Sequence, residues 1–136
     1  MTNPLARRLQ GFAELTADDR RLLDEVVVGA RTVQAHTDLI RQGDKPTHVF
    51  LILEGFACRY KFTVEGRRHI MAYLVPGDLC DLHVAILRHM DHTIGTLSPC
   101  RVVEIPRERI LEMLGRPSLS LALWASVLAD IAVLRE

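Results

Sequence analysis

The stretch that decides the fold is RQGDKPTHVFLILEGFACRYKFTVEGRRHIMAYLVPGDL, residues 41–79. Its glycines stand at steps of twelve, eleven and eleven residues, with apolar runs between them: Gly43, Gly55, Gly66 and Gly77. Short strands joined by glycine-containing turns follow one another at such intervals. The stretch therefore predicts antiparallel strands arranged as a sandwich or a roll.

Within this stretch, the alternation of apolar residues predicts a hairpin. FACRYKF places Phe56, Cys58, Tyr60 and Phe62 on one face of a strand, because successive side chains of a strand point to opposite faces. RRHIMAYL follows the turn VEGR, so we expect residues 56–73 to form the hairpin. Ahead of it, HVFLILEG is an almost continuous apolar run and predicts a further strand.

Helical patterns flank the β region. Thr16 is placed to cap a helix in ELTADDRRLLDEVV, with Asp19 three residues later as its partner. On the other side, TIGTLSPCRVVEI continues in strands until Pro106, which is expected to occupy the first position of a helix that Gly115 ends. These boundaries predict one β domain with N-terminal helices over residues 1–115.

The last segment, RPSLSLALWASVLADIAVLRE at residues 116–136, predicts a long helix with few polar positions. Apolar residues recur along it at a 3-4-3 spacing, and two leucines widen the apolar face: Trp124, Val127, Ile131 and Leu134, with Leu121 and Leu128. Such a helix packs on its own domain or pairs with a second copy. Because it is apolar on several sides, one surface does not bury it, and we expect these residues to form a homodimer interface.

The composition is that of a folded protein without a strong charge. Hydrophobic residues make up 49% and charged residues 25% of the chain, and 17 basic residues balance 17 acidic ones. No net positive field attracts nucleic acid, and no apolar stretch has the length of a signal peptide or a membrane span. We therefore expect a cytoplasmic protein. The cysteines, Cys58, Cys80 and Cys100, lack C-x-x-C spacing, so buried thiols are expected.

Four motifs together resemble the cyclic-nucleotide-binding domain of Crp/Fnr-type bacterial transcription regulators. They are QGD at 42–44, LILEG at 51–55, EGR at 65–67 and YLVPGD at 73–78. The resemblance covers nearly the whole chain. It implies a mainly β fold with flanking helices, namely a double-stranded β-helix of the jelly-roll type, followed by a long C-terminal dimerisation helix.

The resemblance also implies a function and a partner. In this family a DNA-binding winged helix-turn-helix follows the dimerisation helix, whereas this chain stops at Glu136. We therefore expect the effector-sensing and dimerisation domain of a transcription regulator, which contacts DNA only through a C-terminal domain missing from this chain. The alternative is a stand-alone binding module. The effector stays unknown, and no cofactor is implied.

The phosphate-binding cassette of that family is altered in this chain. Ligand-binding members carry a Gly-Glu pair, a short helix, and an arginine followed by a hydroxyl residue and alanine; arginine and the helix N-terminus hold the phosphate, and glutamate holds the ribose. Aligned from YLVPGDL without gaps, the Gly-Glu pair falls on Asp81 and Leu82, and the arginine and hydroxyl fall on His92 and Thr93. Arg88 lies four residues too early. We therefore expect no binding of cyclic AMP or cyclic GMP.

The same loop carries groups that suit another effector. The candidate effector-binding residues are Asp81, Leu82, His83, Arg88, His92 and Thr93. A metal- or redox-responsive module is an alternative, since thiolate and imidazole suit zinc or iron. Its ligands would be Cys80, His83, His89 and His92. Histidines that serve packing or face solvent are the simpler interpretation of this cluster.

A cupin-like metalloenzyme is the alternative from another class of protein. Such β-rolls bind a metal through a His-x-His pair with a later Glu and His. This sequence has no such pair, and His36, His48 and His69 stand singly. It also lacks a recognisable Ser-His-Asp arrangement and a phosphate-binding glycine loop. We therefore expect no enzyme activity.

Overall fold

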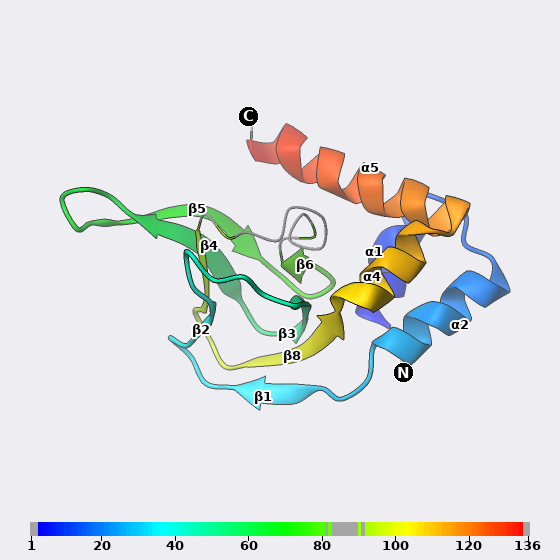
Figure 1. Ribbon diagram of the computed structural model, residues 1–136, viewed down its shortest axis with the longest axis horizontal. Helices are drawn as coiled ribbons and strands as arrows, with labels where there is room; N and C mark the ends of the chain where they lie inside the picture. Colours follow the sequence, from blue (N-terminus) through cyan, green and yellow to red (C-terminus); the bar gives the residue numbers. More distant parts are fainter. Residues whose placement is uncertain (1–2, 81, 83–89, 91, 135–136) are drawn as a thin grey trace.

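The computed structural model describes residues 3–80, 82, 90 and 92–134. In this part of the chain two four-stranded sheets form a roll, and the helices gather at one end of it (Figure 1). The helices are α1 Pro4–Gln10, α2 Ala17–Val26, α4 Arg107–Leu114 and α5 Pro117–Leu134. The strands are β1 Arg31–Val33, β2 Asp38–Ile40, β3 His48–Glu54, β4 Ala57–Phe62, β5 Arg68–Leu74, β6 Leu79–Cys80, β7 Thr93–Thr96 and β8 Cys100–Pro106.

The two sheets join strands that are distant in the sequence. One sheet has the order β1-β8-β3-β6 and the other the order β2-β7-β4-β5. The paired strands run antiparallel. Each sheet thus draws strands from both halves of the β region, as a jelly roll does. The predicted mainly β fold with flanking helices is confirmed.

Strand β3 is a continuous apolar run because both of its faces are covered. Val49 and Leu51 belong to a cluster that includes buried residues of α1, α2, α4 and α5. Phe50 and Ile52, which point the other way, belong to a second cluster between the two sheets. A strand with one face in water would alternate apolar and polar residues instead. The helices therefore cover the outer face of the sheet that contains β3.

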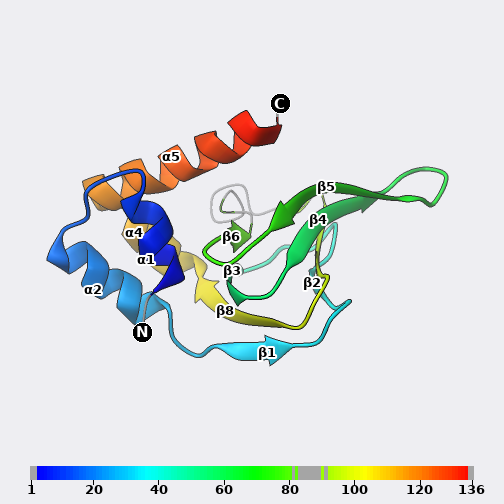
Figure 2. The ribbon, with the colours of Figure 1, turned by 180° about the vertical axis from the view of Figure 1, so that it is seen from behind.

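The predicted hairpin is formed by β4 and β5, and its tip projects away from the helices (Figures 1 and 2). Cys58 and Tyr60 are buried, as their shared face predicts. The ring of Phe62 meets the ring of Tyr60 edge-on, with centroids 5.6 Å apart, yet Phe62 is 62% exposed. The alternation of apolar residues therefore predicted correctly that these side chains share one face of the strand. Phe62 lies at the end of the roll, however, and is exposed there.

The four glycines that space the strands lie in turns, as predicted. All have positive φ, namely 91°, 102°, 83° and 95° for Gly43, Gly55, Gly66 and Gly77. Gly55 is restricted by its neighbours as well. A Cβ atom at this position would lie 2.5 Å from the carbonyl oxygen of Pro99 and 2.7 Å from Sγ of Cys100. The turn between β3 and β4 therefore requires glycine for two independent reasons.

The start of helix α4 differs from the sequence expectation, and the start of helix α1 was not predicted at all. Pro106 has extended backbone, with φ −59° and ψ 146°, so it ends β8 and α4 begins at Arg107 rather than at the proline. The start of α1 was not predicted, although it has a sequence signal. The side chain of Asn3 accepts hydrogen bonds from two amides of the first turn, and Pro4 occupies the first helical position.

Candidate functional site

The candidate effector loop, residues 80–93, is described in part. The predicted site residues within the description are Cys80, Leu82, His92 and Thr93. Those that lie outside the described residues are Asp81, His83, Arg88 and His89. The roles of the second group stay predictions. The first group shows how the ends of the loop are held.

The loop begins at β6, which is anchored in the core. Cys80 pairs with Phe50 of β3 and is fully buried between the sheets. In the turn just before β6, the carboxylate of Asp78 accepts a hydrogen bond of 2.8 Å from the backbone N–H of Val75. Burial raises the pKa of Asp78, and the hydrogen bond from Val75 and the charge of Arg8 oppose this only in part. The YLVPGD motif therefore fixes the direction in which the chain enters the loop.

The QGD motif holds the other end of the loop. The N–H of Gly43 donates to the carbonyl of Met90 at 2.9 Å, and the N–H of Met90 donates to the carbonyl of Asp44 at 3.3 Å. The N–H of Gln42 donates to Oγ1 of Thr93 at 3.0 Å. The hydroxyl of Thr93, which stands at the hydroxyl position of the family's cassette, thus accepts a hydrogen bond from the protein's own backbone. This role was not predicted, because it joins two motifs that are far apart in the sequence.

Of the described side chains at the altered cassette positions, one is buried and one is half-buried. His92 is 4% exposed. Leu82 is half-buried and packs against the cluster beneath the helices. Leucine has no group that can bond a ribose, and histidine is only partly cationic near neutral pH. These two positions therefore lack the permanent charges that hold a cyclic nucleotide.

The predicted metal site is only partly within the described residues. Among the described residues there is no group of three or more His, Cys, Asp or Glu side chains that could hold a metal ion. The predicted ligands His83 and His89 lie outside this search. The metal alternative therefore stays a prediction, with Cys80 and His92 as its described members.

The three cysteines are free and buried, as expected: Cys58, Cys80 and Cys100. Burial raises the pKa of the Cys58 thiol, while Arg68 opposes the shift and Asp38 adds to it. Sγ of Cys100 donates to the carbonyl of Ser98 at 3.3 Å. A buried thiol with a raised pKa is a poor nucleophile, so Cys58 suits packing rather than redox chemistry.

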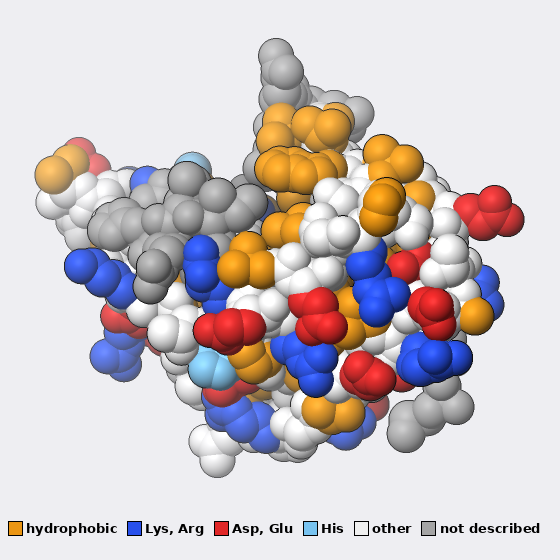
Figure 3. All heavy atoms as spheres, turned by 45° about the vertical axis from the view of Figure 1, so that its right-hand side comes forward, with side chains coloured by type: hydrophobic (Ala, Val, Ile, Leu, Met, Phe, Trp, Pro, Cys, Tyr) orange, Lys and Arg blue, Asp and Glu red, His pale blue; other side chains and the backbone are white. Residues whose placement is uncertain are grey.

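Helix α5 presents two different faces. Leu119, Ala122 and Leu123 are buried in the cluster beneath the helices. The residues on the opposite side form what we call the α5 row, and they are 63%, 51%, 62% and 45% exposed: Leu121, Trp124, Leu128 and Ile131. Figure 3 shows hydrophobic side chains gathered along the helix that leads to the C-terminus. The helix is therefore docked on one side and open on the other.

The α5 row includes most of the predicted interface residues. Val127 is half-buried, between the two faces, and the side chain of Leu134 lies outside the description. Contiguous exposed apolar residues on a folded domain mark a surface that contacts another molecule. None of the helices that the structure describes is long and apolar enough to cross a membrane.

The start of α5 is fastened to α2 through a buried carboxylate. Asp19, which is 3% exposed, forms the predicted capping box with Thr16. Its carboxylate also accepts a hydrogen bond from the hydroxyl of Ser118 and lies 3.7 Å from the guanidinium of Arg116. Burial on its own would raise the pKa of Asp19, but the hydrogen bonds from Ser118 and Thr16, with the charge of Arg116, lower it below its ordinary value.

Asp19→Asn should destabilise the domain at neutral pH by about 1.5–3 kcal/mol, the usual contribution of hydrogen bonds to a charged group. Because the pKa of Asp19 is lowered in the folded state, its contribution is complete above the unfolded value near 3.8 and is lost as pH falls through the folded value. Urea unfolding from pH 7 down to pH 2 measures this. The exposed neighbour Asp18 provides the control variant, Asp18→Asn, and equal losses for the two variants would contradict the prediction.

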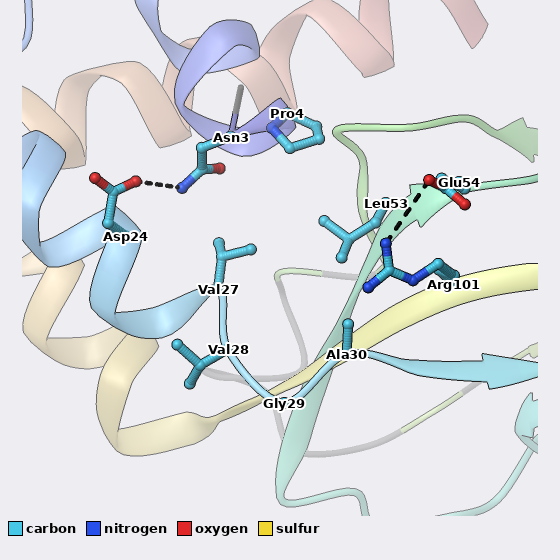
Figure 4. A pocket seen from close by; sticks show the side chains of 10 residues that line it. All are labelled: Asn3, Pro4, Asp24, Val27, Val28, Gly29, Ala30, Leu53, Glu54 and Arg101. Carbon is cyan, nitrogen blue, oxygen red and sulfur yellow. Dashed lines mark hydrogen bonds and ion pairs between the residues drawn. The ribbon is translucent and has the colours of Figure 1, made fainter. Parts of the chain in front are cut away.

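A pocket of about 410 Å³ lies between the first two helices and the sheet (Figure 4). Val27, Val28 and Leu53 give it aliphatic walls, and Arg101 faces Glu54 across 3.7 Å at its side. Among the residues that the structure describes, none that lines the pocket belongs to the 80–93 loop or to the predicted site. The sequence offered no signal for the pocket, because these walls come from four separate segments.

These features define a β-roll in which two turn motifs hold the ends of the 80–93 loop. The family model of the cyclic nucleotide-binding domain matches residues 30–116. The chain belongs to the cyclic nucleotide-binding domain family. The recognition of a Crp/Fnr-type sensory domain is confirmed, because the curated relatives are activators of that type.

Two relatives are similar to this chain over the same share of its length. The transcriptional activator protein Anr of Pseudomonas aeruginosa is 30% identical over 99 residues, which cover 73% of this chain and 41% of that protein. The transcriptional activator protein FnrA of Stutzerimonas stutzeri is 29% identical over 99 residues, with the same coverage of 73% and 41%. The chain thus matches about two fifths of the length of these relatives.

Solved structures show the same fold at low sequence identity. The catabolite activator protein of Thermus thermophilus has a TM-score of 0.75 at 18% identity, over 95% of this chain and 58% of that one. The sensor domain of the transcriptional regulator DNR from Pseudomonas aeruginosa has a TM-score of 0.70 at 18% identity, over 93% and 84%. The likeness to the DNR domain spans the roll and most of the helices.

Proposed function

We propose that this chain is the effector-sensing and dimerisation part of a Crp/Fnr-type transcription regulator. The family and the relatives named as transcriptional activators support the regulator class. In this proposal residues 1–115 respond to the effector, residues 116–136 join two copies, and a helix-turn-helix domain of the full-length protein binds DNA. The protein then acts in the cytoplasm.

The observation that carries the proposal is the α5 row. One side of α5 is docked on its own domain, so the row on the other side is available to a second α5 helix. Its 3-4-3 spacing keeps the row on one line, as in a coiled-coil seam. Sedimentation velocity of the unaltered chain is the test. A dimer is expected at tens of micromolar, about the range in which a modest interface associates.

The effector in this proposal is not a cyclic nucleotide. The burial of His92 and the packing of Leu82 support this, because each takes a position where the family's ligand contacts are made. The loop instead carries thiol, imidazole and carboxylate groups, which suit a metal ion, a redox signal or a small polar ligand. Metal analysis of protein purified without chelators distinguishes the first of these from the others.

Isothermal calorimetry should detect no saturable binding of cyclic AMP or cyclic GMP in the micromolar range, where binding corresponds to about −8 kcal/mol. The physical reason is that no arginine stands at the position of His92 to hold the cyclic phosphate. A regulator with an intact Gly-Glu and Arg-Ser-Ala cassette serves as the positive control. Saturable micromolar binding would mean that Arg88 or another group holds the phosphate.

A further inference from the structure

Arg8 on α1 joins the roll to α5 through each nitrogen of its guanidinium group. Nη1 lies 3.2 Å from Oδ1 of Asp78, in the turn between β5 and β6. Nη2 lies 2.9 Å from Oδ1 of Asp130, and Nε donates to Oγ of Ser126 at 3.1 Å, both on α5. The guanidinium is a planar fork with fixed donor directions. One side chain therefore holds the turn and the helix at set positions relative to each other.

Helix α1 is itself held between these two elements. Leu5 and Leu9 are each 1% exposed in the cluster beneath the helices. Gly77 of the turn lies so close that a Cβ atom there would be 3.1 Å from the carbonyl oxygen of Pro4 and 3.6 Å from Cβ of Arg8. On its other side α1 packs beside α5 (Figure 2). If the turn is displaced towards the helices, it therefore pushes against α1 and does not move into solvent.

The two ion pairs of Arg8 are unequal. The side chain of Asp78 is 14% exposed, whereas that of Asp130 is 45% exposed. Charges attract more strongly where less water surrounds them. Among the described residues, Asp130 and Arg59 also act on Asp78: the charge of Asp130 raises its pKa and that of Arg59 lowers it. Arg8 therefore joins a largely buried carboxylate of the turn, through one ion pair, to the more exposed part of α5, through two hydrogen bonds.

The turn leads directly into β6 and the 80–93 loop, and Ser126 and Asp130 lie in the part of α5 that carries Leu128 and Ile131. We propose that Arg8 is a positioning residue that transmits a displacement of the loop to the second half of α5, and so sets the geometry of the α5 row. This inference rests on the proposed function, which makes the loop the effector site and α5 the dimer helix. It gives α1 the role of coupling the 80–93 loop to α5.

Hydrogen exchange of the α5 backbone tests the inference in the chain alone, at one protein concentration. Asp78→Asn keeps the shape of the side chain and removes its charge. It should speed exchange in residues 126–134 by roughly tenfold, the loss expected for one charge-assisted contact. Residues 117–123 should not change, because buried side chains hold them. In an Arg8→Ala background, Asp78→Asn should have no further effect on α5.

Two more variants make the test specific. Arg7→Ala removes an exposed arginine from the same helix and should leave α5 unchanged. Arg8→Lys keeps the charge without the fork, so it should uncouple Asp78 from α5 as Arg8→Ala does. Amides of β3 and β8 report whether each variant is folded, and Arg8→Lys replaces Arg8→Ala if the latter unfolds.

The inference is wrong if Asp78→Asn leaves exchange in α5 unchanged, if its effect persists without Arg8, or if lysine at this position restores the coupling. No effector is used, and exchange in α5 can be measured in a monomer or a dimer. Failure of the proposed function would appear separately, as a monomer in sedimentation or as saturable binding of a cyclic nucleotide in calorimetry.

Discussion

Ile131→Glu should convert the proposed dimer of this chain into a monomer. Ile131 is 45% exposed in the α5 row, so its substitution leaves the core of the domain intact. In the dimer the same position would place an unpaired carboxylate against the partner helix, which costs about 3–5 kcal/mol. The dissociation constant should therefore rise by roughly two orders of magnitude or more. Sedimentation velocity over a dilution series measures the change.

The control for this variant is Val28→Glu. Val28 is 62% exposed and lies between α2 and β1, away from α5, so the same kind of substitution should leave the dimer unchanged. Thermal unfolding of both variants establishes that each keeps the fold. A dimer that survives Ile131→Glu would place the interface elsewhere, and an unaltered chain that is monomeric at tens of micromolar would remove the basis of the prediction.

Gly55→Ala should produce the largest loss of stability among conservative changes in the turns. An L-residue at φ 102° is strained by about 1–2 kcal/mol. The added methyl group would also meet the backbone oxygen of Pro99 at 2.5 Å, and overpacking of this kind costs about 1–3 kcal/mol more. We expect a total loss of about 2–5 kcal/mol, measured by urea unfolding at pH 7.

Gly66→Ala separates the two contributions. Gly66 also has positive φ, 83°, but a Cβ atom there would meet nothing within 4 Å. Its substitution should therefore cost only the backbone term, about 1–2 kcal/mol. If both alanine variants lose the same free energy of unfolding, the close approach at Gly55 does not contribute to that loss. The β3–β4 turn would then adjust to the methyl group without cost.

Local sequence patterns predicted the elements whose cause is local. The capping box of Thr16 and Asp19 depends on residues three positions apart. The turn glycines depend on their own φ angles. Of the residues at the predicted 3-4-3 spacing on α5, Trp124 and Ile131 lie on the exposed face, whereas Val127 is half-buried between the two faces. Each of these features is decided within a few residues of chain.

Contacts between segments that are distant in the sequence could not be predicted from local patterns. The capping box could be predicted, but the bond from Ser118 to the same carboxylate could not, because 99 residues separate the two positions. The contact of Gln42 with Thr93 and the fork of Arg8 belong to this class. For the effector loop, the alignment with a cassette could identify missing charges, but charges that are missing do not identify the molecule that replaces the nucleotide.

The strand order has a consequence for how the chain folds during its synthesis. β8 is the shared neighbour of β1 and β3, with Arg31 opposite Val102 and Leu51 opposite Val103. The first sheet therefore cannot close until residues 100–106 have left the ribosome. Until then the apolar β3, whose two faces the finished fold covers, stays without most of its partners, and unpaired apolar strands aggregate. While β8 is still being made, β3 is thus an exposed apolar segment that a ribosome-bound chaperone can protect from aggregation.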